Sequence, residues 1–275
     1  MLYIIKYNEI ILKGKNRRHF ESLLLDNIVN SYKNKGIRYS SIKKTQNRIM
    51  IESDEFEALK DIMGVDTLQK ATKARLDIKD IKKAALSLIK DKRAGTFKIS
   101  TNRVNKSFPY GSVSLNSILG KHIQGRLDLQ VDLENPDIEI KVDILDSAYL
   151  SSEIVKGPGG LPLGSSGRVI SLIQGQRSIL AALLMMKRGA KILPAFFSQK
   201  DLSLLEKYNS GFSFGPLLIS GFSGLDCYAG KIKACVTGQT LRDFNNLPLK
   251  LPVLRPLVAY TGSQIKEQLE FYKAR

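Results

Sequence analysis

Residues 156–173, KGPGGLPLGSSGRVISLI, join an irregular segment to a buried type of strand. The part at 156–167 is dense in glycine, proline and serine and has no hydrophobic period, which is typical of a connection between domains. Val169–Ile173 is a short apolar run, which predicts a strand covered on both faces. We therefore expect a domain boundary near residue 165.

The residues after this strand alternate between helical and strand patterns. Ser178–Lys187 has a helical apolar pattern, Lys191–Phe197 is typical of a second strand, and Lys231–Thr237 of a later one. Strand, helix and strand in this order favour a parallel, doubly wound sheet. Residues 166–275 are therefore expected to form a shortened, Rossmann-like α/β domain.

The residues before the boundary contain two smaller groups of elements. The first is expected to have strands at 2–6, 48–52 and 68–76 and helices at 20–29 and 54–63. The second is expected to have helices at 78–89 and 113–125 and strands at 96–100, 129–133 and 138–145. Both groups are α+β. The chain of 275 residues should thus form three domains, at residues 1–60, 61–165 and 166–275.

The charge of the chain is strongly positive. There are 43 Lys and Arg against 26 Asp and Glu, for a net charge of +17. Residues 1–110 carry +12 (24 basic, 12 acidic), residues 111–165 carry −4 (4 and 8) and residues 166–275 carry +9 (15 and 6). This uneven excess favours nucleic acid as a partner. The alternative is a lysine-rich proteome, which would raise the charge without such a partner.

The composition also excludes several classes of protein. Two cysteines, Cys227 and Cys235, are too few for a disulfide scaffold, and with His19 and His122 as the histidines we expect no metal site and no Ser–His–Asp hydrolase. The longest apolar run, Ile179–Met186, is far below the ~20 residues of a membrane span, and the start lacks a basic signal-peptide region. A cytoplasmic protein that does not contact membranes is expected.

Four segments together resemble the tRNA 4-thiouridine synthetases, also called tRNA sulfurtransferases. They are YNEIILKGKNRRHFE at 7–21, FKISTNRVNKSFP at 97–109, PDIEIKVDI at 136–144, and the segment at 156–173. The resemblance implies a ferredoxin-like domain, a THUMP domain that binds tRNA and a PP-loop pyrophosphatase domain. In that family the last domain adenylates a uridine at tRNA position 8 with ATP before sulfur replaces its oxygen. The resemblance also implies a homodimer.

Two basic loops are the expected RNA contacts. The first surrounds Gly14 in a turn before a helix, where cations can reach phosphate. Its members are Lys13, Lys15, Arg17 and Arg18. The second follows a strand, where hydroxyl, amide and cationic groups can contact phosphate and 2′-OH groups. Its members are Thr101, Arg103, Asn105, Lys106 and Phe108, with Lys121 and Arg126 on the next helix. Phe108 taken alone is better explained by packing under the loop.

The nucleotide loop that the resemblance implies is altered here. Family members have Ser-Gly-Gly, any residue and Asp-Ser after the strand, so that backbone N–H groups surround the pyrophosphate and the Asp helps to place the metal-bound nucleotide. Residues 173–179 read IQGQRSI, with one glycine and no carboxylate, and Arg177 stands near the expected Asp. Residual nucleotide contacts would come from Ile173, Gly175, Arg177, Ser178, Phe197, Gly238 and Gln239.

Two further parts of the implied active site are not found in the sequence. The family loop with Glu-Ser-Leu-Gly-Gln is missing, because Val236–Gly238 runs directly into Gln239–Leu241, and no cysteine occupies the persulfide position that follows Arg-Pro-Leu in many members. We therefore expect no catalytic residues. Cys235, inside a strand, is expected in the core.

The preferred hypothesis is a tRNA-binding, non-catalytic or accessory factor in tRNA modification that needs neither ATP nor Mg²⁺. The alternative is a working ATP-dependent tRNA sulfurtransferase that makes 4-thiouridine at tRNA position 8. In that case a divergent loop would bind ATP and Mg²⁺. A separate sulfur donor or catalytic subunit would be a partner.

Overall fold

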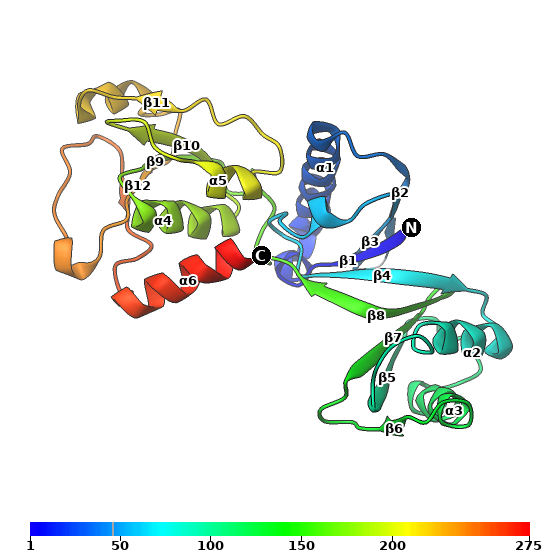
Figure 1. Ribbon diagram of the computed structural model, residues 1–275. Coiled ribbons are helices and arrows are strands. Elements are labelled where there is room, and N and C mark those ends of the chain that lie inside the picture. The colour runs from blue at the N-terminus through cyan, green and yellow to red at the C-terminus, as the bar shows by residue number, and fades with distance from the viewer. Residues whose placement is uncertain (46) are drawn as a thin grey trace. The chain divides into compact units, whose positions relative to one another are not determined.

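The computed structural model describes residues 1–45 and 47–275, which form two compact units. Unit 1 comprises Met1–Ile5, Tyr39–Ser53 and Leu68–Val155, and unit 2 comprises Lys6–Arg38, Asp54–Thr67 and Lys156–Arg275 (Figure 1). The first 67 residues are thus shared between the two units. The division into consecutive domains at 1–60, 61–165 and 166–275 stays a prediction. In the described part of the chain, no helix is long and apolar enough to span a membrane.

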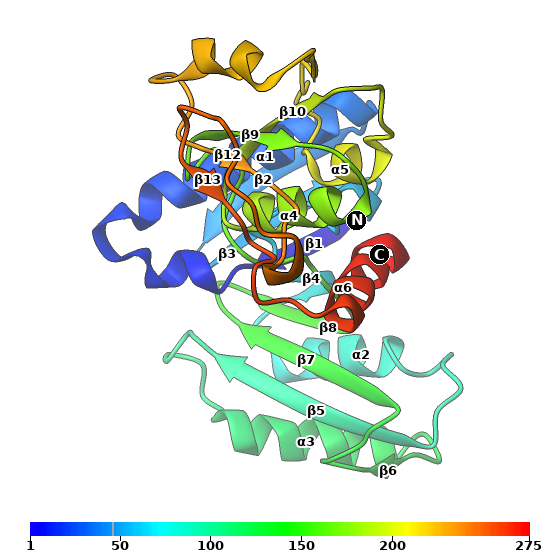
Figure 2. The ribbon, with the colours of Figure 1, turned by 90° about the vertical axis from the view of Figure 1, so that its left-hand side faces the viewer.

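Unit 1 is built on an eight-stranded sheet in the order β2-β3-β1-β4-β8-β7-β5-β6. Its strands are β1 (Leu2–Lys6), β2 (Tyr39–Thr45), β3 (Arg48–Ser53), β4 (Thr67–Ala74), β5 (Thr96–Arg103), β6 (Gln130–Val131), β7 (Ile138–Ile144) and β8 (Ala148–Lys156). Its helices are α2 (Ile78–Ser87) and α3 (Ser112–Gln124), which lie beside the β5–β7 part of the sheet (Figure 2). β5 pairs with β6 and β7 in parallel, whereas β7 pairs with β8 antiparallel.

The core of unit 1 forms where two helices cover one face of the sheet. Phe97 and Ile99 alternate with more exposed residues along β5, so one face of this strand is buried. Ile81 of α2 and Leu115 of α3 belong to the same apolar cluster. Asp77 caps the N-terminus of α2, because its carboxylate accepts a hydrogen bond from the Lys79 N–H at 2.8 Å.

Several elements of unit 1 differ from their sequence-based ranges. The expected strand at 129–133 pairs only over Gln130–Val131. β2 was not expected, because its residues are mostly exposed and lack an apolar alternation. β8 was also missed, because four consecutive buried residues at its start do not alternate.

Unit 2 contains a parallel sheet of five strands in the order β11-β10-β9-β12-β13. The strands are β9 (Arg168–Leu172), β10 (Lys191–Phe196), β11 (Leu217–Leu218), β12 (Cys235–Val236) and β13 (Val253–Leu254). β9 pairs in parallel with both β10 and β12, with Ile170 opposite Leu193 and Cys235. The expected parallel sheet is confirmed, although the strand expected at 231–237 pairs only over β12.

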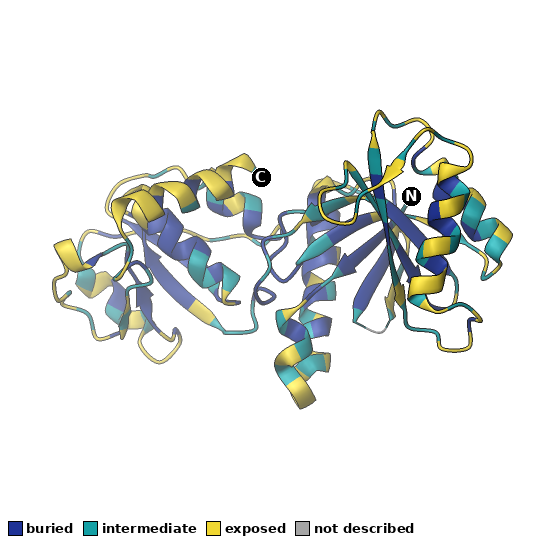
Figure 3. Cartoon of the chain, turned by 90° about the horizontal axis from the view of Figure 1, so that it is seen from below, coloured by how far each residue is buried: buried dark blue, intermediate teal, exposed yellow. Residues whose placement is uncertain are grey.

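The parallel sheet of unit 2 is buried on both faces, as the apolar run at 169–173 predicts. Val169 and Ile173 belong to one apolar cluster, with α4 (Gln176–Lys187) and α6 (Gly262–Ala274), whereas Ile170 belongs to a second cluster. Cys235 belongs to the second cluster and is fully buried, which confirms its expected place in the core. Figure 3 shows the strands as largely buried and the outer helix faces as exposed.

Three shorter helical segments complete this half of unit 2. They are α5 (Ser203–Tyr208), the 3₁₀ segment η3 (Phe222–Tyr228) and the 3₁₀ segment η4 (Leu241–Asp243).

The N-terminal part of unit 2 contributes η1 (Glu9–Asn16), α1 (Arg17–Lys35) and η2 (Glu57–Leu59). The helix expected at 54–63 was wrong, because only the single 3₁₀ turn η2 forms and Gly64, with φ +99°, ends the segment. The structure thus replaces most of that helix by turns.

Three asparagines of α1 fasten the N-terminal segment to the C-terminal part of unit 2. The side-chain amides of Asn27, Asn30 and Asn34 donate to the carbonyls of Leu163, Ser210 and Gly211 at 3.3, 2.7 and 2.6 Å. These positions lie on one face of the helix, because residues three and four apart are neighbours. We call this row of contacts the asparagine seam.

The irregular connection at 156–167 approaches other backbone segments closely. A Cβ on Gly157 would lie 2.0 Å from the Val65 carbonyl oxygen, and one on Gly160 would lie 2.1 Å from the Lys187 carbonyl oxygen. Gly160 also has φ +77°, in the region that favours glycine. These two positions explain why the connection requires glycine rather than a larger residue.

Candidate functional site

A crevice lies where the strand order of the parallel sheet reverses. The chain continues from β9 towards β10 on one side and from β12 towards β13 on the other, and open α/β sheets bind ligands at such a reversal. The loops after β9 and β12 line a cavity of about 230 Å³ at this place. Its lining residues are Gln174, Gly175, Gln176, Arg177, Ser178, Gly238, Gln239 and Asp243.

The structure brings together most of the residues expected to retain nucleotide contacts. They are Gly175, Arg177, Ser178, Gly238 and Gln239. Two others do not line the cavity. Ile173 is buried in the core, and the ring of Phe197 packs against that of Phe222 at 5.5 Å.

The hydroxyl of Ser178 forms hydrogen bonds with two backbone N–H groups of the loop. Its Oγ accepts from the N–H groups of Gln174 at 2.8 Å and Gly175 at 3.0 Å, and it donates to the Gly175 carbonyl at 2.7 Å. Ser178 is 3% exposed, so this hydroxyl is held in place. Two of the N–H groups that could donate to a pyrophosphate, those of Gln174 and Gly175, therefore already have a partner inside the chain.

A carboxylate that the sequence did not indicate also reaches the cavity. The Arg177 guanidinium lies 2.8 Å from Asp243 Oδ2, and Asp243 Oδ1 accepts from the Thr240 hydroxyl at 2.7 Å and the Thr240 N–H at 2.8 Å. These Thr240 hydrogen bonds, followed by the charge of Arg177, hold the pKa of Asp243 below its usual value. Arg177 is thus paired with an ionised carboxylate of its own chain.

The segment after β12 is held close to the start of α4. A Cβ on Gly238 would lie 2.6 Å from the Ser178 nitrogen, so only glycine allows this approach. The Gln239 side chain accepts from Arg255 Nε at 2.9 Å, and Arg255 also donates to the Asn245 carbonyl at 2.8 Å. These hydrogen bonds hold the segment from Gly238 to Asn245, which lines one side of the cavity.

The residues present do not fit a metal-bound triphosphate. The cavity of about 230 Å³ is smaller than the roughly 300–1,000 Å³ of small-molecule sites. Two of its N–H donors, those of Gln174 and Gly175, are used by Ser178, and its carboxylate is paired with Arg177. In the part of the chain that the structure describes, no group of three or more His, Cys, Asp or Glu side chains is placed to hold a metal ion.

The basic turn around Gly14 divides into structural and exposed cations. Gly14 has φ +51°, which accounts for a glycine at the kink inside η1, three residues before α1 begins. Arg17 Nε lies 2.7 Å from Glu21 Oε1, whose carboxylate also accepts from the Tyr7 hydroxyl at 2.7 Å. Burial and this bond to Glu21 raise the pKa of Tyr7 to about 12. Arg17 is therefore committed to a largely buried cluster.

The other cations of this turn have less constrained side chains. The Lys13 ammonium lies 5.1 Å from the centre of the Phe20 ring. Lys15 and Arg18 are exposed, and neither forms an ion pair in the described part of the chain. Of the four residues expected in this turn, these two are the best placed to contact phosphate.

The loop after β5 is held by several of the residues expected to contact RNA. Arg103 donates to the carbonyls of Phe108 at 3.0 Å and Tyr110 at 3.4 Å, and Asn105 donates to the Leu145 carbonyl at 2.9 Å. Phe108 is 4% exposed and packs in the core, as expected for this residue alone. The loop therefore presents Lys106, which is exposed.

The remaining expected RNA contacts lie on β5, on α3 and just after α3. Thr101 is half-buried on β5, and Lys121 is exposed on α3. Arg126 approaches His122 Nδ1 at 3.0 Å. Burial, followed by the charge of Arg126, lowers the pKa of His122. His122 is thus a structural neighbour of Arg126 rather than a separate cation.

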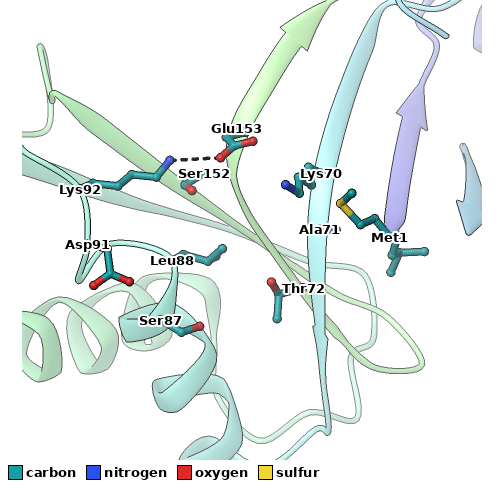
Figure 4. A pocket seen from close by; sticks show the side chains of 11 residues that line it. Met1, Lys70, Ala71, Thr72, Ser87, Leu88, Asp91, Lys92, Ser152 and Glu153 are labelled. Atoms are coloured by element: carbon teal, nitrogen blue, oxygen red, sulfur yellow. Dashed lines mark ion pairs between the residues drawn. The ribbon is translucent and has the colours of Figure 1, made fainter. Parts of the chain in front are cut away.

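A second cavity, in unit 1, was not expected from the sequence. It has a volume of about 360 Å³ and lies between Met1, strands β4 and β8, and the end of α2. Figure 4 shows Lys70, Lys92 and Glu153 around it, and Lys92 lies 3.6 Å from Glu153. Its lysines come from separate elements, so no local motif could indicate it.

The matches to known proteins agree with this architecture. The model of the ThiI ferredoxin-like domain matches residues 2–68, and the model of the THUMP domain matches residues 75–153. A probable tRNA sulfurtransferase of Moorella thermoacetica is 33% identical, over 96% of this chain and 81% of that protein. The chain belongs to the tRNA sulfurtransferase family.

Other members of the tRNA sulfurtransferase family are longer. A probable tRNA sulfurtransferase of Caldanaerobacter subterraneus is 37% identical over 70% of this chain and 52% of its own length. The chain thus spans about half the length of several curated relatives that it matches.

Two solved structures resemble nearly the whole chain. PH1313 from Pyrococcus horikoshii has a TM-score of 0.87 and 27% identity, with 100% of this chain and 99% of PH1313 covered. A 4-thiouridine synthetase, solved with RNA and bound ATP, has a TM-score of 0.78 and 25% identity, with 98% and 84% covered. The expected fold class, a ferredoxin-like and THUMP region followed by a parallel α/β domain, is confirmed.

Proposed function

We propose that this tRNA sulfurtransferase family member binds tRNA as a non-catalytic or accessory factor in tRNA modification. Its net charge of +17 and its exposed Lys15, Arg18 and Lys106 support binding to an RNA backbone. One observation carries the non-catalytic part. The Ser178 hydroxyl accepts from the Gln174 and Gly175 N–H groups and the Asp243 carboxylate pairs with Arg177, so three donors beside the cavity already have partners within the chain.

A second candidate function is the ATP-dependent synthesis of 4-thiouridine at tRNA position 8. The exposure of the Arg177–Asp243 pair favours it, because the two side chains are 52% and 39% exposed. An ion pair exposed to this extent contributes only about 0–1 kcal/mol, so a phosphate could displace Asp243 from Arg177. In this case Asp243 would also supply a carboxylate near the bound nucleotide.

Calorimetric titration with ATP and Mg²⁺, with and without tRNA, distinguishes the two functions. The non-catalytic proposal expects no measurable binding of ATP and no tRNA-dependent release of pyrophosphate. Micromolar affinity for ATP together with tRNA-dependent pyrophosphate release would refute it. The absence of both would leave the enzymatic candidate without support.

The RNA-binding part is tested with charge reversals at matched positions. Lys15→Glu and Lys106→Glu should each weaken tRNA binding and reduce the slope of log affinity against log salt by roughly 0.7–0.9 per lost phosphate contact. Lys266→Glu changes the net charge equally on an exposed position of α6 and serves as the control. Equal effects of all three substitutions would show that only total charge matters.

The same proposal includes a homodimer and a separate sulfur donor or catalytic subunit as partners. A homodimer would let the RNA-binding region of one chain serve its partner. Sedimentation of the full chain with and without tRNA tests this part. A single monomeric species under both conditions would contradict the homodimer.

A further inference from the structure

A half-exposed aromatic ring stands beside the candidate nucleotide cavity. Phe244 directly follows Asp243, which lines that cavity, and it is 51% exposed. The Arg255 guanidinium lies over the ring, 4.3 Å from its centre, which is the geometry of a cation–π contact. In the part of the chain that the structure describes, Phe244 contacts no other aromatic ring. Because the guanidinium covers one face of the ring, the exposed area lies on its other face and its edge.

The cation that covers this ring is fixed by hydrogen bonds from all three of its nitrogens. Arg255 donates from Nε to Gln239 Oε1 at 2.9 Å and from Nη2 to the Asn245 carbonyl at 2.8 Å. Its third nitrogen, Nη1, donates to the Val253 carbonyl at 3.4 Å. The side chains of Gln239 and Asn245 also bond each other. The ring is therefore held in place before any ligand arrives, which lowers the entropic cost of binding to it.

This support distinguishes Phe244 from an ordinary exposed residue. A single exposed apolar side chain is common on protein surfaces and needs no ligand. Here a planar cation holds the ring from one side and leaves the other side open. Exposed aromatic rings and arginine guanidinium planes are the groups on which unstacked RNA bases lie. The pair of Phe244 and Arg255 thus has the composition of a base-stacking site.

The charges around the ring suit a nucleic acid backbone. Residues 239–260 contain three basic residues and one acidic residue, Asp243. The Asp243 carboxylate is paired with Arg177 at 2.8 Å. Arg242, two residues before Phe244, is exposed and forms no ion pair in the described part of the chain. A phosphate beside the ring therefore meets an unpaired cation and no unpaired carboxylate of this segment.

We propose that Phe244, backed by Arg255, stacks an unpaired base of the bound tRNA, and that Arg242 contacts the phosphate next to this base. This inference rests on the proposed tRNA binding, and it adds a base contact to the phosphate contacts of the two basic loops. Stacking is tolerant of sequence, because every base has a π-face. The site therefore selects unpaired nucleotides over paired ones without reading their identity.

The sequence contains no tryptophan, so Phe244→Trp places a single tryptophan at this site. Its fluorescence should be quenched as tRNA is added, and less by a fully paired RNA duplex, whose bases are not free to stack on the ring. Phe271→Trp is the matched control, because Phe271 is 45% exposed and its ring centre lies 5.3 Å from the Arg275 guanidinium. The emission of this control should not change.

The affinity for tRNA is the second measurement. Phe244→Ala should weaken binding about 5- to 150-fold, which corresponds to the loss of one stacked base. The slope of log affinity against log salt should stay unchanged in this variant, because stacking releases no counterions. Phe244→Tyr should keep the affinity, whereas Arg242→Gln should reduce the slope by roughly 0.7–0.9. Circular dichroism verifies that all variants are folded.

Several outcomes would overturn this inference. They are an unchanged tRNA affinity in Phe244→Ala, and equal quenching of Phe244→Trp by tRNA and by the duplex. Quenching by ATP without RNA would assign the ring to a free nucleotide, and loss of self-association in Phe244→Ala, by sedimentation, would assign it to a second copy of the chain. Absence of tRNA binding by the wild-type protein would refute the proposed function as well, whereas binding that depends on Lys15 and Lys106 but not on Phe244 would refute this inference alone.

Discussion

Replacing Ser178 with alanine tests how the nucleotide loop is closed. The hydroxyl of Ser178 accepts from the Gln174 and Gly175 N–H groups at 2.8 and 3.0 Å and donates to the Gly175 carbonyl at 2.7 Å. Ser178→Ala removes all three bonds without adding volume. The Gln174 and Gly175 N–H groups, just before α4, then lose this partner within the chain.

The expected loss of stability follows from the exposure of this loop. A fully buried N–H without a partner costs about 1–3 kcal/mol. Gln174 and Gly175 are exposed, so water can replace the hydroxyl at both N–H groups. The total cost should therefore lie near the lower end, at about 1–2 kcal/mol, similar to the loss of a helix-capping side chain.

Urea denaturation of the variant and the wild-type protein measures this free energy of unfolding. Ser22→Ala is the matched control, because the Ser22 hydroxyl is exposed and bonds one carbonyl, of Arg18, at 3.0 Å, so its removal should change stability by less than about 0.5 kcal/mol. Inorganic pyrophosphate should also bind Ser178→Ala more tightly, because the freed N–H groups can donate to it. Unchanged stability with unchanged pyrophosphate affinity would refute the reasoning.

Three further changes test other parts of the structure. Arg17→Gln should lower the free energy of unfolding in urea by about 1.5–3 kcal/mol, because it removes a charged hydrogen-bond donor from the Glu21 carboxylate, which is 6% exposed. The salt dependence of tRNA binding should stay unchanged. Gly160→Ala should lower the free energy of unfolding by about 3 kcal/mol, because its Cβ would lie 2.1 Å from a carbonyl oxygen. Gly175→Ala is the control, because this position has open space and an extended backbone, and it should cost about 1 kcal/mol or less. Thermal denaturation of both variants measures the difference. Burial raises the pKa of Asp61, so the protonated carboxyl favours the folded state and this contribution to stability is lost as the pH rises. Asp61→Asn should therefore be more stable than the wild-type protein at pH 7, and the difference should be smaller near pH 4. Urea denaturation at both pH values measures the free energies of unfolding, and an equal or larger difference at pH 4 would contradict the expectation.

The central elements of both units could be predicted from local sequence patterns. The apolar run at 169–173 is buried on both faces, and the helical patterns at 78–89 and 178–187 correspond to α2 and α4. Their periodicity reflects burial, which is the main source of such patterns. β2 could not be predicted, because an exposed edge strand carries no apolar alternation.

The residues that line the candidate cavity could be predicted from the sequence only in part. Gly175, Ser178 and Gly238 belong to short segments that the family resemblance located, whereas Asp243 reaches Arg177 only through the tertiary fold. The pairing of Arg17 with Glu21, by contrast, has an i, i+4 spacing on a helix, so the sequence did contain a signal that this arginine serves the fold.

The asparagine seam has a consequence for how the protein is made. The Asn30 amide bonds a carbonyl that lies 180 residues later in the chain. A ribosome adds about 5–20 residues per second, so α1 waits roughly 10–40 s after its own synthesis before that carbonyl exists. During this interval the Asn30 amide is hydrated, and the seam can close only after Ser210 and Gly211 have been added. A growing chain therefore exposes its first long helix to chaperones and proteases until these residues have been made.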